Sequence, residues 1–242
     1  MNFRFEGAVC IGIRGVNGSG KSTLLKCLSG LLRPSDGTVT WQWNKENLDI
    51  RMIRYQIGFA APYIQLYSEL TVTENLSLIK QMRPKRTLTY SNISVVSTIE
   101  NSANDSSRLQ HESPSDHPNK TESKPGTNTG SQSNFQYMTQ LPVMSSLLEN
   151  FGLSGLAEHE FGTLSSGQQQ RVKLAGALVT RPPILMLDEP GTNLDAAGLT
   201  LVSEIVTQHR SGGGMVFLAS NRDEDLVLCD EIMQLSNPQP FN

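Results

Sequence analysis

Eight residues, GVNGSGKS from Gly15 to Ser22, have the types and the spacing of a phosphate-binding loop. Every fixed position of the pattern G-x-x-x-x-G-K-[ST] is matched. Glycines let the backbone approach an anion without a Cβ clash, and the N–H groups at the start of the following helix point at that anion. The segment therefore predicts a phosphate site rather than an ordinary glycine-rich turn. The residues expected to bind the ligand are Gly15, Asn17, Gly18, Ser19, Gly20, Lys21, Ser22 and Thr23.

Charged and hydroxyl side chains in and beyond this loop predict that the site also binds a metal ion and catalyses a reaction. Lys21 is expected to reach the β- and γ-phosphates of a nucleotide, and the Ser22 hydroxyl to bind Mg²⁺. Residues 184–187 are an apolar run that ends in Asp188 and Glu189. Asp188 is a suitable Mg²⁺ ligand, and Glu189 is placed to accept a proton from an attacking water. An acidic turn after a strand is common, but combined with the phosphate loop it predicts a catalytic Mg²⁺–nucleotide site.

A third segment, LSSGQQQR from Leu164 to Arg171, opens a glutamine-rich helix with serine and glycine. The N-terminus of such a helix can face an anion. On physical grounds alone, however, an N-capped helix without a ligand is the favoured interpretation, because serine is among the preferred N-cap residues.

Periodic apolar patterns predict the elements that position these segments. Residues 8–13 predict a strand before the phosphate loop, and residues 23–28 a helix after it. Short apolar runs then alternate with helical patterns, which is typical of an α/β protein with a mostly parallel sheet and helices on both faces. Ligands of such sheets bind at the carboxyl ends of the strands. Further strands are expected at 38–43, 57–61, 184–187 and 215–219, and helices at 71–82, 166–180 and 196–209.

The composition restricts the class of protein. The 242 residues carry a net charge of −3, so nothing global attracts nucleic acid or an anionic membrane. No apolar run is as long as a membrane span, and we expect no signal peptide. The three cysteines, Cys10, Cys27 and Cys229, lie far apart in the sequence, and we interpret them as free thiols in a reducing cytosol.

Residues 85–140 differ from the rest of the chain, because they are rich in Ser, Asn, Thr, Pro and Gln and lack sustained apolar periodicity. We expect most of this insertion to be disordered. The alternative is a small ordered unit, since residues 93–96 could form a strand.

The three motifs, in this order, resemble the nucleotide-binding domain of ATP-binding cassette (ABC) transporter ATPases. Residues 15–22 match the Walker A loop of that family, and residues 187–190 match the end of its Walker B motif. LSSGQ at 164–168 matches the signature motif LSGGQ, with Ser166 in place of the first glycine, and residues 191–195 match the D-loop. The resemblance covers residues 8–83 and 143–235.

The resemblance implies a P-loop NTPase fold: a RecA-like core with a mostly parallel sheet, plus an ABC-type helical subdomain. We expect a single domain over 1–242. The nucleotide-binding core would comprise 1–70 and 165–242, and the helical subdomain would comprise 71–164 and carry the low-complexity insertion.

The implied function is that of an ATP-binding and ATP-hydrolysing subunit with ATP and Mg²⁺ as cofactors. Two such ATPase subunits, in a homo- or heterodimer, would pair head to tail, with each ATP between the Walker A loop of one and the signature helix of the other. Transmembrane permease subunits would be separate chains, nucleic acid would not be a partner, and this subunit would lie on the cytoplasmic face of the membrane. Residues expected to contact the partner's nucleotide or the interface are Ser165, Gly167, Gln168 and Asp195.

Three positions depart from the family pattern. Pro62 stands where the family has a glutamine that contacts Mg²⁺, and Gln65 is either its substitute as a metal ligand or a surface residue. Asn221 stands where the family has a histidine at the γ-phosphate; an amide can hydrogen-bond there but carries no positive charge, so slower hydrolysis is expected. Phe3 and Phe5 are too close to Lys21 in sequence to be assigned as an adenine-stacking aromatic.

Two other functions fit less well. A soluble ABC ATPase acting on nucleic acid or the ribosome would be expected to have basic arms, zinc modules or coiled coils, which this sequence lacks. A nucleotide-binding partner without hydrolysis is suggested by Pro62 and Asn221, but Glu189 argues against it.

Overall fold

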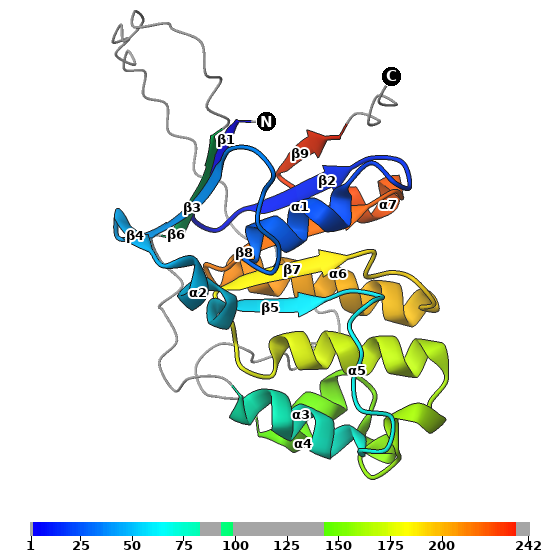
Figure 1. Cartoon of the computed structure of the whole chain (residues 1–242). Coiled ribbons are helices and arrows are strands. Elements are labelled where there is room, and N and C mark those ends of the chain that lie inside the picture. The colour runs from blue at the N-terminus through cyan, green and yellow to red at the C-terminus, as the bar shows by residue number, and fades with distance from the viewer. Residues whose placement is uncertain (1, 83–92, 99–142, 236–242) are drawn as a thin grey trace, which may run out of the picture.

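A computed structural model of the chain describes residues 2–82, 93–98 and 143–235. Its centre is a five-stranded parallel sheet with the order β5-β7-β8-β2-β9 (Figure 1). The interior strands β7 and β8 are buried throughout, which explains why they appear in the sequence as continuous apolar runs. The strands are β2 (Cys10–Arg14), β5 (Ile57–Ala60), β7 (Ile184–Asp188), β8 (Met215–Ser220) and β9 (Glu231–Gln234).

Helices cover both faces of this sheet, as the alternating pattern predicts. Helix α1 (Lys21–Leu28) packs on one face with Ile184 and Met186 of β7. Helices α5 (Ser166–Leu178) and α6 (Ala196–Ser211) pack on the other face with Leu185 and Leu187. The carboxyl ends of β2, β7 and β8 therefore meet at one edge, where α1 begins (Figure 1).

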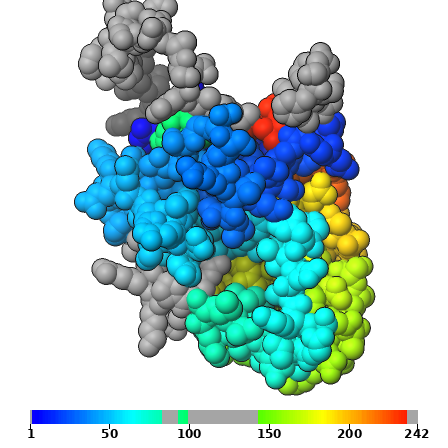
Figure 2. All heavy atoms as spheres, in the orientation of Figure 1, coloured from blue at the N-terminus to red at the C-terminus, as the bar shows by residue number. Residues whose placement is uncertain are grey.

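A helical layer lies below α5. Helices α3 (Val72–Gln81) and α4 (Met144–Asn150) share an apolar core with α5 that includes Leu76 and Leu148. Thr71 caps α3 and Glu74 bonds back to the Thr71 N–H, so the capping box expected from the sequence is confirmed. Between this layer and the core above it the surface is hollowed (Figure 2). The short elements are α2 (Ile50–Ile53), α7 (Asp223–Leu226), and the 3₁₀ turns η1 (Arg54–Gln56), η2 (Ser154–Leu156) and η3 (Phe161–Thr163).

A second sheet has four antiparallel strands in the order β1-β6-β3-β4. Its strand β6 lies between β1 and β3, pairing with β3 along its whole length and with β1 over residues 94–97. The sequence analysis expected most of 85–140 to be disordered; that expectation is wrong at 93–98, where the strand considered at 93–96 is present. This strand is part of the four-stranded sheet and not of the separate small ordered unit given as the alternative. The remainder of the insertion lies outside the described residues. The strands are β1 (Phe3–Glu6), β3 (Thr38–Trp43), β4 (Glu46–Leu48) and β6 (Ile93–Thr98).

Packing explains why β6 is ordered. Val95 and Ile93 are buried against Phe5, Trp41 and the rest of the core that covers α1. The Trp41 indole N–H also donates to the Leu28 carbonyl at 2.8 Å, which ties the antiparallel sheet to the end of α1. Burying two branched side chains contributes on the order of 3–5 kcal/mol, which supports a strand in a polar stretch of sequence. Residues 93–98 thus pack with the core and not with α3 and α4.

Candidate nucleotide-binding site

The phosphate loop connects β2 to α1 and is shaped by its glycines. A Cβ atom at Gly15 would lie 2.3 Å from the Ser19 Oγ, so any other residue there would force Ser19 to move. Gly18 and Gly20 have φ angles of +85° and +96°, a region that other residues rarely adopt. Lys21 is only 5% exposed, and its ammonium donates to the Gly15 carbonyl at 2.8 Å. The lysine is therefore held inside the loop, next to where a phosphate would enter.

The phosphate loop and the acidic pair line one pocket, as predicted from the sequence. Its volume is about 430 Å³. Residues of both motifs meet here because β2 and β7 are both neighbours of β8. The pocket is lined by Asn17, Gly18, Gly20, Lys21, Ser22, Thr23, Pro62, Tyr63, Asp188 and Glu189.

Asp188 is the buried anion of this pocket. It ends β7, is 1% exposed, and within the described residues neither of its carboxylate oxygens has a hydrogen-bond partner of normal geometry. A buried carboxylate without strong partners is unfavourable unless a cation compensates it. With the Ser22 hydroxyl lining the same pocket, the donor set of carboxylate and hydroxyl oxygens fits a hydrated Mg²⁺ ion.

Tyr63 is a pocket residue that sequence reasoning missed. Burial and the neighbouring Asp188 carboxylate raise the pKa of its hydroxyl. The Lys26 ammonium lies 3.9 Å from the centre of its ring, a cation–π contact that fixes the side chain. The sequence offers little to predict this role, because Tyr63 belongs to no motif and only its position just after β5 places it near the carboxyl ends of the strands.

Glu189 has an unusual backbone. Its φ angle is +47°, which is strained for a residue with a side chain, and its N–H donates to the Ala219 carbonyl at 2.8 Å. One carboxylate oxygen lies 3.9 Å from the Lys21 ammonium. The turn at the end of β7 thus directs Glu189 toward the phosphate loop, as the assignment of a general base requires.

Asn221 and Gln65, the two residues considered as replacements for the family's histidine and glutamine, have different locations. The Asn221 amide follows β8 and donates to the Asn17 side chain at 3.3 Å, so the structure brings it to the phosphate loop. Gln65 does not line the phosphate pocket. It lines an apolar groove between β5, α3 and α5, while Pro62 and Tyr63 occupy the pocket. Gln65 therefore lies away from Ser22 and Asp188, the other metal-binding candidates. Of the two alternatives, a metal ligand or a surface residue, the geometry favours the surface residue.

The signature motif forms the start of α5. Ser165 and Gln168 make a reciprocal capping box, with 2.9 Å from the Ser165 N–H to the Gln168 side chain. A Cβ at Gly167 would lie 2.8 Å from the Asn193 carbonyl, so the D-loop packs against this turn.

Asp195 accepts from the Gly198 N–H and pairs with Arg171 at 2.9 Å, and these contacts hold the pKa of its carboxyl below the usual range. None of the four residues expected at the interface (Ser165, Gly167, Gln168 and Asp195) lines the phosphate pocket of its own chain.

A family model described as "ABC transporter" matches residues 1–192 of the chain. This chain belongs to the ABC transporter family. It is similar to an uncharacterized ABC transporter ATP-binding protein, YybJ, of Bacillus subtilis, at 26% identity over 98% of the chain and 84% of that protein. It is also similar to the cytochrome c biogenesis ATP-binding export protein CcmA of Rhizobium johnstonii, at 28% identity over 92% of the chain and 80% of that protein.

Solved structures show the same fold. The dimeric structure of MJ0796, a bacterial ABC transporter cassette, matches with a TM-score of 0.61 and 22% identity over 95% of this chain and 82% of that one. The family match and the ATP-binding relatives together identify the chain as the ATP-binding and ATP-hydrolysing subunit of an ABC transporter. Among the described residues no helix has the length and apolar character needed to cross a membrane.

Proposed function

We propose that this ABC ATPase works as a head-to-tail dimer of nucleotide-binding domains, in which each ATP lies between the phosphate loop of one chain and the signature helix of the other. The observation that carries this proposal is the exposed start of α5. Ser165 is exposed and Gly167 and Gln168 are half-buried, yet no residue of this turn reaches the phosphate pocket of the same chain. The partial positive charge of a helix N-terminus favours an anion supplied by a second molecule. Asp195, which braces the neighbouring turn, is assigned to the same interface.

Within the phosphate pocket, Ser22 and Asp188 are the residues that would hold Mg²⁺, which neutralises charge on phosphate oxygens when it is bound. Lys21 binds the β- and γ-phosphates, and Glu189 accepts the proton of the attacking water. Asn221 donates a hydrogen bond to the γ-phosphate but supplies no charge, so turnover is slower than it would be with a cation at this position.

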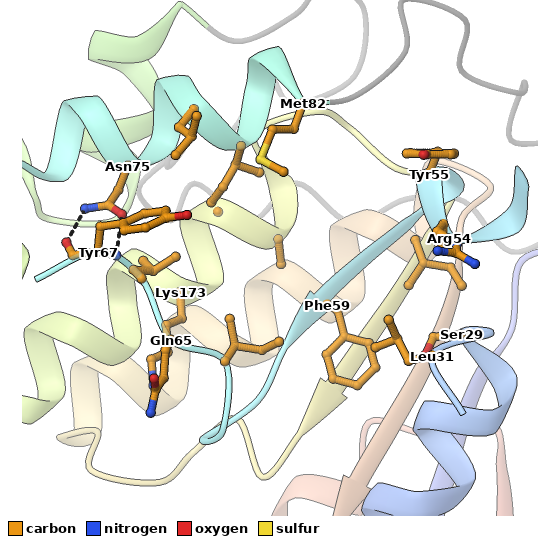
Figure 3. Close-up of a pocket in the computed structure, with 17 residues that line it drawn as sticks. Ser29, Leu31, Arg54, Tyr55, Phe59, Gln65, Tyr67, Asn75, Met82 and Lys173 are labelled. Atoms are coloured by element: carbon orange, nitrogen blue, oxygen red, sulfur yellow. Dashed lines mark hydrogen bonds between the residues drawn. The ribbon is translucent and has the colours of Figure 1, made fainter. Parts of the chain in front are cut away.

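Membrane subunits are assigned to the apolar groove between the two layers. Side chains from β5, the loop after it, α3, α5 and the segment after α1 line this groove (Figure 3). Its volume is about 460 Å³. Large apolar side chains remain exposed along it, with Leu31 at 57%, Tyr67 at 61% and Met82 at 71%. Such a patch is typical of a protein–protein contact, and an apolar segment of a permease on the cytoplasmic face of the membrane fits it.

The same proposal divides the chain into a nucleotide-binding core, residues 1–70 and 165–242, and a helical subdomain, residues 71–164, within one domain. Strand β6 is the exception to this division because it packs in the core. Nucleic acid is not a partner, since the net charge of −3 offers no attraction for phosphate backbones.

The test is ATP turnover by the purified chain together with its Glu189→Gln variant, and size-exclusion chromatography of both in Mg-ATP. Removing a general base lowers kcat by about 10²–10⁴-fold, and the variant should accumulate as a dimer because trapped ATP is not cleaved. The matched control is Glu149→Gln on α4, an exposed glutamate outside the phosphate pocket. The control should keep both turnover and elution volume.

ATP binding without turnover or dimer formation by the wild-type chain would contradict the homodimer, and a second, different ATPase subunit would then be required. Loss of turnover in the Glu149 variant would contradict the specific assignment of Glu189.

A further inference from the structure

Two cysteines that are 219 residues apart in the sequence lie side by side in the structure. Cys10 begins β2 and Cys229 precedes β9, and their Sγ atoms are 3.4 Å apart. A Cβ at Gly12 would lie 3.1 Å from the Cys229 Sγ, so this side chain lies directly over β2. All three cysteines are free thiols, as expected from the sequence, but the sequence did not show that two of them lie together.

The backbone around the pair is fixed on both sides. The Asp230 N–H donates to the Cys10 carbonyl at 2.8 Å, and the Cys10 N–H donates to the Asp230 carboxylate at 2.8 Å. The other Asp230 oxygen pairs with Arg210 at the end of α6 at 2.6 Å. Because three elements hold these residues in place, the closeness of the two sulfur atoms is built into the fold and does not depend on a loose loop.

The two thiols have different environments. Cys10 is fully buried, whereas Cys229 is partly exposed. The hydrogen bond between them raises the pKa of the Cys10 thiol and lowers that of Cys229. The thiolate is the reactive form of cysteine, so Cys229 is both the more accessible and the more reactive of the pair, and Cys10 is placed behind it.

We propose that Cys10 and Cys229 form a reversible intramolecular disulfide when the protein meets a peroxide oxidant. The Cys229 thiolate attacks one peroxide oxygen; an S–O bond forms, the O–O bond breaks, and the departing hydroxide leaves as water with the thiol proton. The Cys10 thiol then attacks the Cys229 sulfur, an S–S bond replaces the S–O bond, and the second water carries away the remaining proton. Two thiols are oxidised, one peroxide is reduced to two waters, and a dithiol reductant reverses the change.

This disulfide would cross-link β2 covalently to the segment that leads into β9. At the other end of these strands the Leu235 N–H donates to the Arg14 carbonyl at 2.8 Å, immediately before the phosphate loop. Cross-linking positions so far apart in the sequence restricts the unfolded chain strongly. The oxidised protein should therefore melt about 5 °C or more above the reduced protein.

The experiment uses the 242-residue chain with Cys27→Ala, so that Cys10 and Cys229 are its only cysteines. The reduced protein is treated with hydrogen peroxide, the free thiols are alkylated under denaturing conditions, and the intact mass and the peptide map are recorded. We expect a loss of about 2 Da from two hydrogens, no alkylation, a Cys10–Cys229 linked peptide, and the higher melting temperature. A dithiol reductant should restore both thiols and the original melting temperature.

A Cys229→Ser variant in the same background is the matched control. It removes the partly exposed thiol and leaves the core residue Cys10 in place, so it should fold, should not lose mass, and should show no shift in melting temperature with peroxide. The proposal is overturned if the peroxide-treated pair remains fully alkylatable, or if Cys229 gains oxygen while Cys10 stays free. Cross-linked dimers in place of the internal peptide would also overturn it.

Discussion

Among the described residues, buried ionisable side chains occur in the parallel sheet and its helices, but not in the antiparallel sheet. Lys21, Asp188 and His209 are all buried and belong to the parallel sheet or to α1 and α6. In the described part of the antiparallel sheet, Ser94 is the one buried polar residue, and it has no charge to lose. Lys21 and Asp188 lie at the carboxyl edge of the parallel sheet and line the phosphate pocket, whereas His209 packs against Gly214 at the opposite end of β8. The parallel sheet and its helices therefore hold buried ionisable groups both in the pocket and away from it, whereas the antiparallel sheet contributes support.

The strongest test of this difference between the two sheets is to place a charge in the core of the antiparallel sheet. Val95→Asp in β6 should lower the free energy of unfolding by about 4 kcal/mol, because it buries an unpaired carboxylate beside Trp41. Turnover per folded molecule should stay unchanged. Urea unfolding and ATPase assays at the same protein concentration measure both quantities.

The matched control is Val96→Asp, which lies on the other face of β6 and is only half-buried. A loss of about 1 kcal/mol is expected there, from strand propensity alone. Equal effects at the two positions would show that β6 is not packed as described.

The second largest expected effect is a dependence of the free energy of unfolding on pH, caused by His209 on α6, which packs on the parallel sheet. Burial lowers the pKa of His209 from 6.5 to about 4, so the folded protein keeps this side chain neutral while the unfolded chain takes up a proton. The unfolded state thus binds more protons between these two values, and stability falls as pH decreases from 6.5 to about 4, by about 3 kcal/mol. Urea unfolding at several pH values follows this loss.

His209→Gln should flatten this dependence, whereas His159→Gln, at an exposed position, should keep it. The same slope in both variants would assign the pH dependence to other groups.

The sequence analysis succeeded where residue type is restricted by chemistry. It brought the phosphate loop, Asp188 and Glu189 to one pocket, because few residue types fit a glycine-rich phosphate-binding pattern or an acidic pair at the end of a strand; the chemical role of each residue stays a prediction. Strand β6 was given only as an alternative, because its apolar residues lie in a polar stretch and their partners Phe5 and Trp41 are far away in the sequence. Tyr63 was missed because its contacts with Lys26 and Asp188 join segments that are far apart in the sequence, and no local pattern reports them. The Cys10–Cys229 contact depends on the pairing of β2 with β9, and no local pattern reports that pairing.

The smallest predicted effect separates capping from catalysis by comparing two helices of the same chain. Thr71 on α3 and Ser165 on α5 both make complete capping boxes, so Thr71→Ala and Ser165→Ala should each cost about 1 kcal/mol of stability. Only Ser165→Ala should also lower ATP turnover, because only that helix N-terminus is assigned to the partner's nucleotide. Thermal melts and steady-state ATPase rates test the pair, and equal turnover in the two variants would argue against the signature role of Ser165.

The positions of the strands along the chain also have a consequence for folding during synthesis on the ribosome. All four strands of the antiparallel sheet lie within the first 98 residues, whereas the parallel sheet takes β7, β8 and β9 from beyond residue 183. Synthesis proceeds from the N-terminus, and chain segments can begin to fold as they emerge. The supporting sheet can thus assemble while the acidic pair of the catalytic pocket is still untranslated, and the phosphate loop must wait for strands that are made more than 160 residues after it.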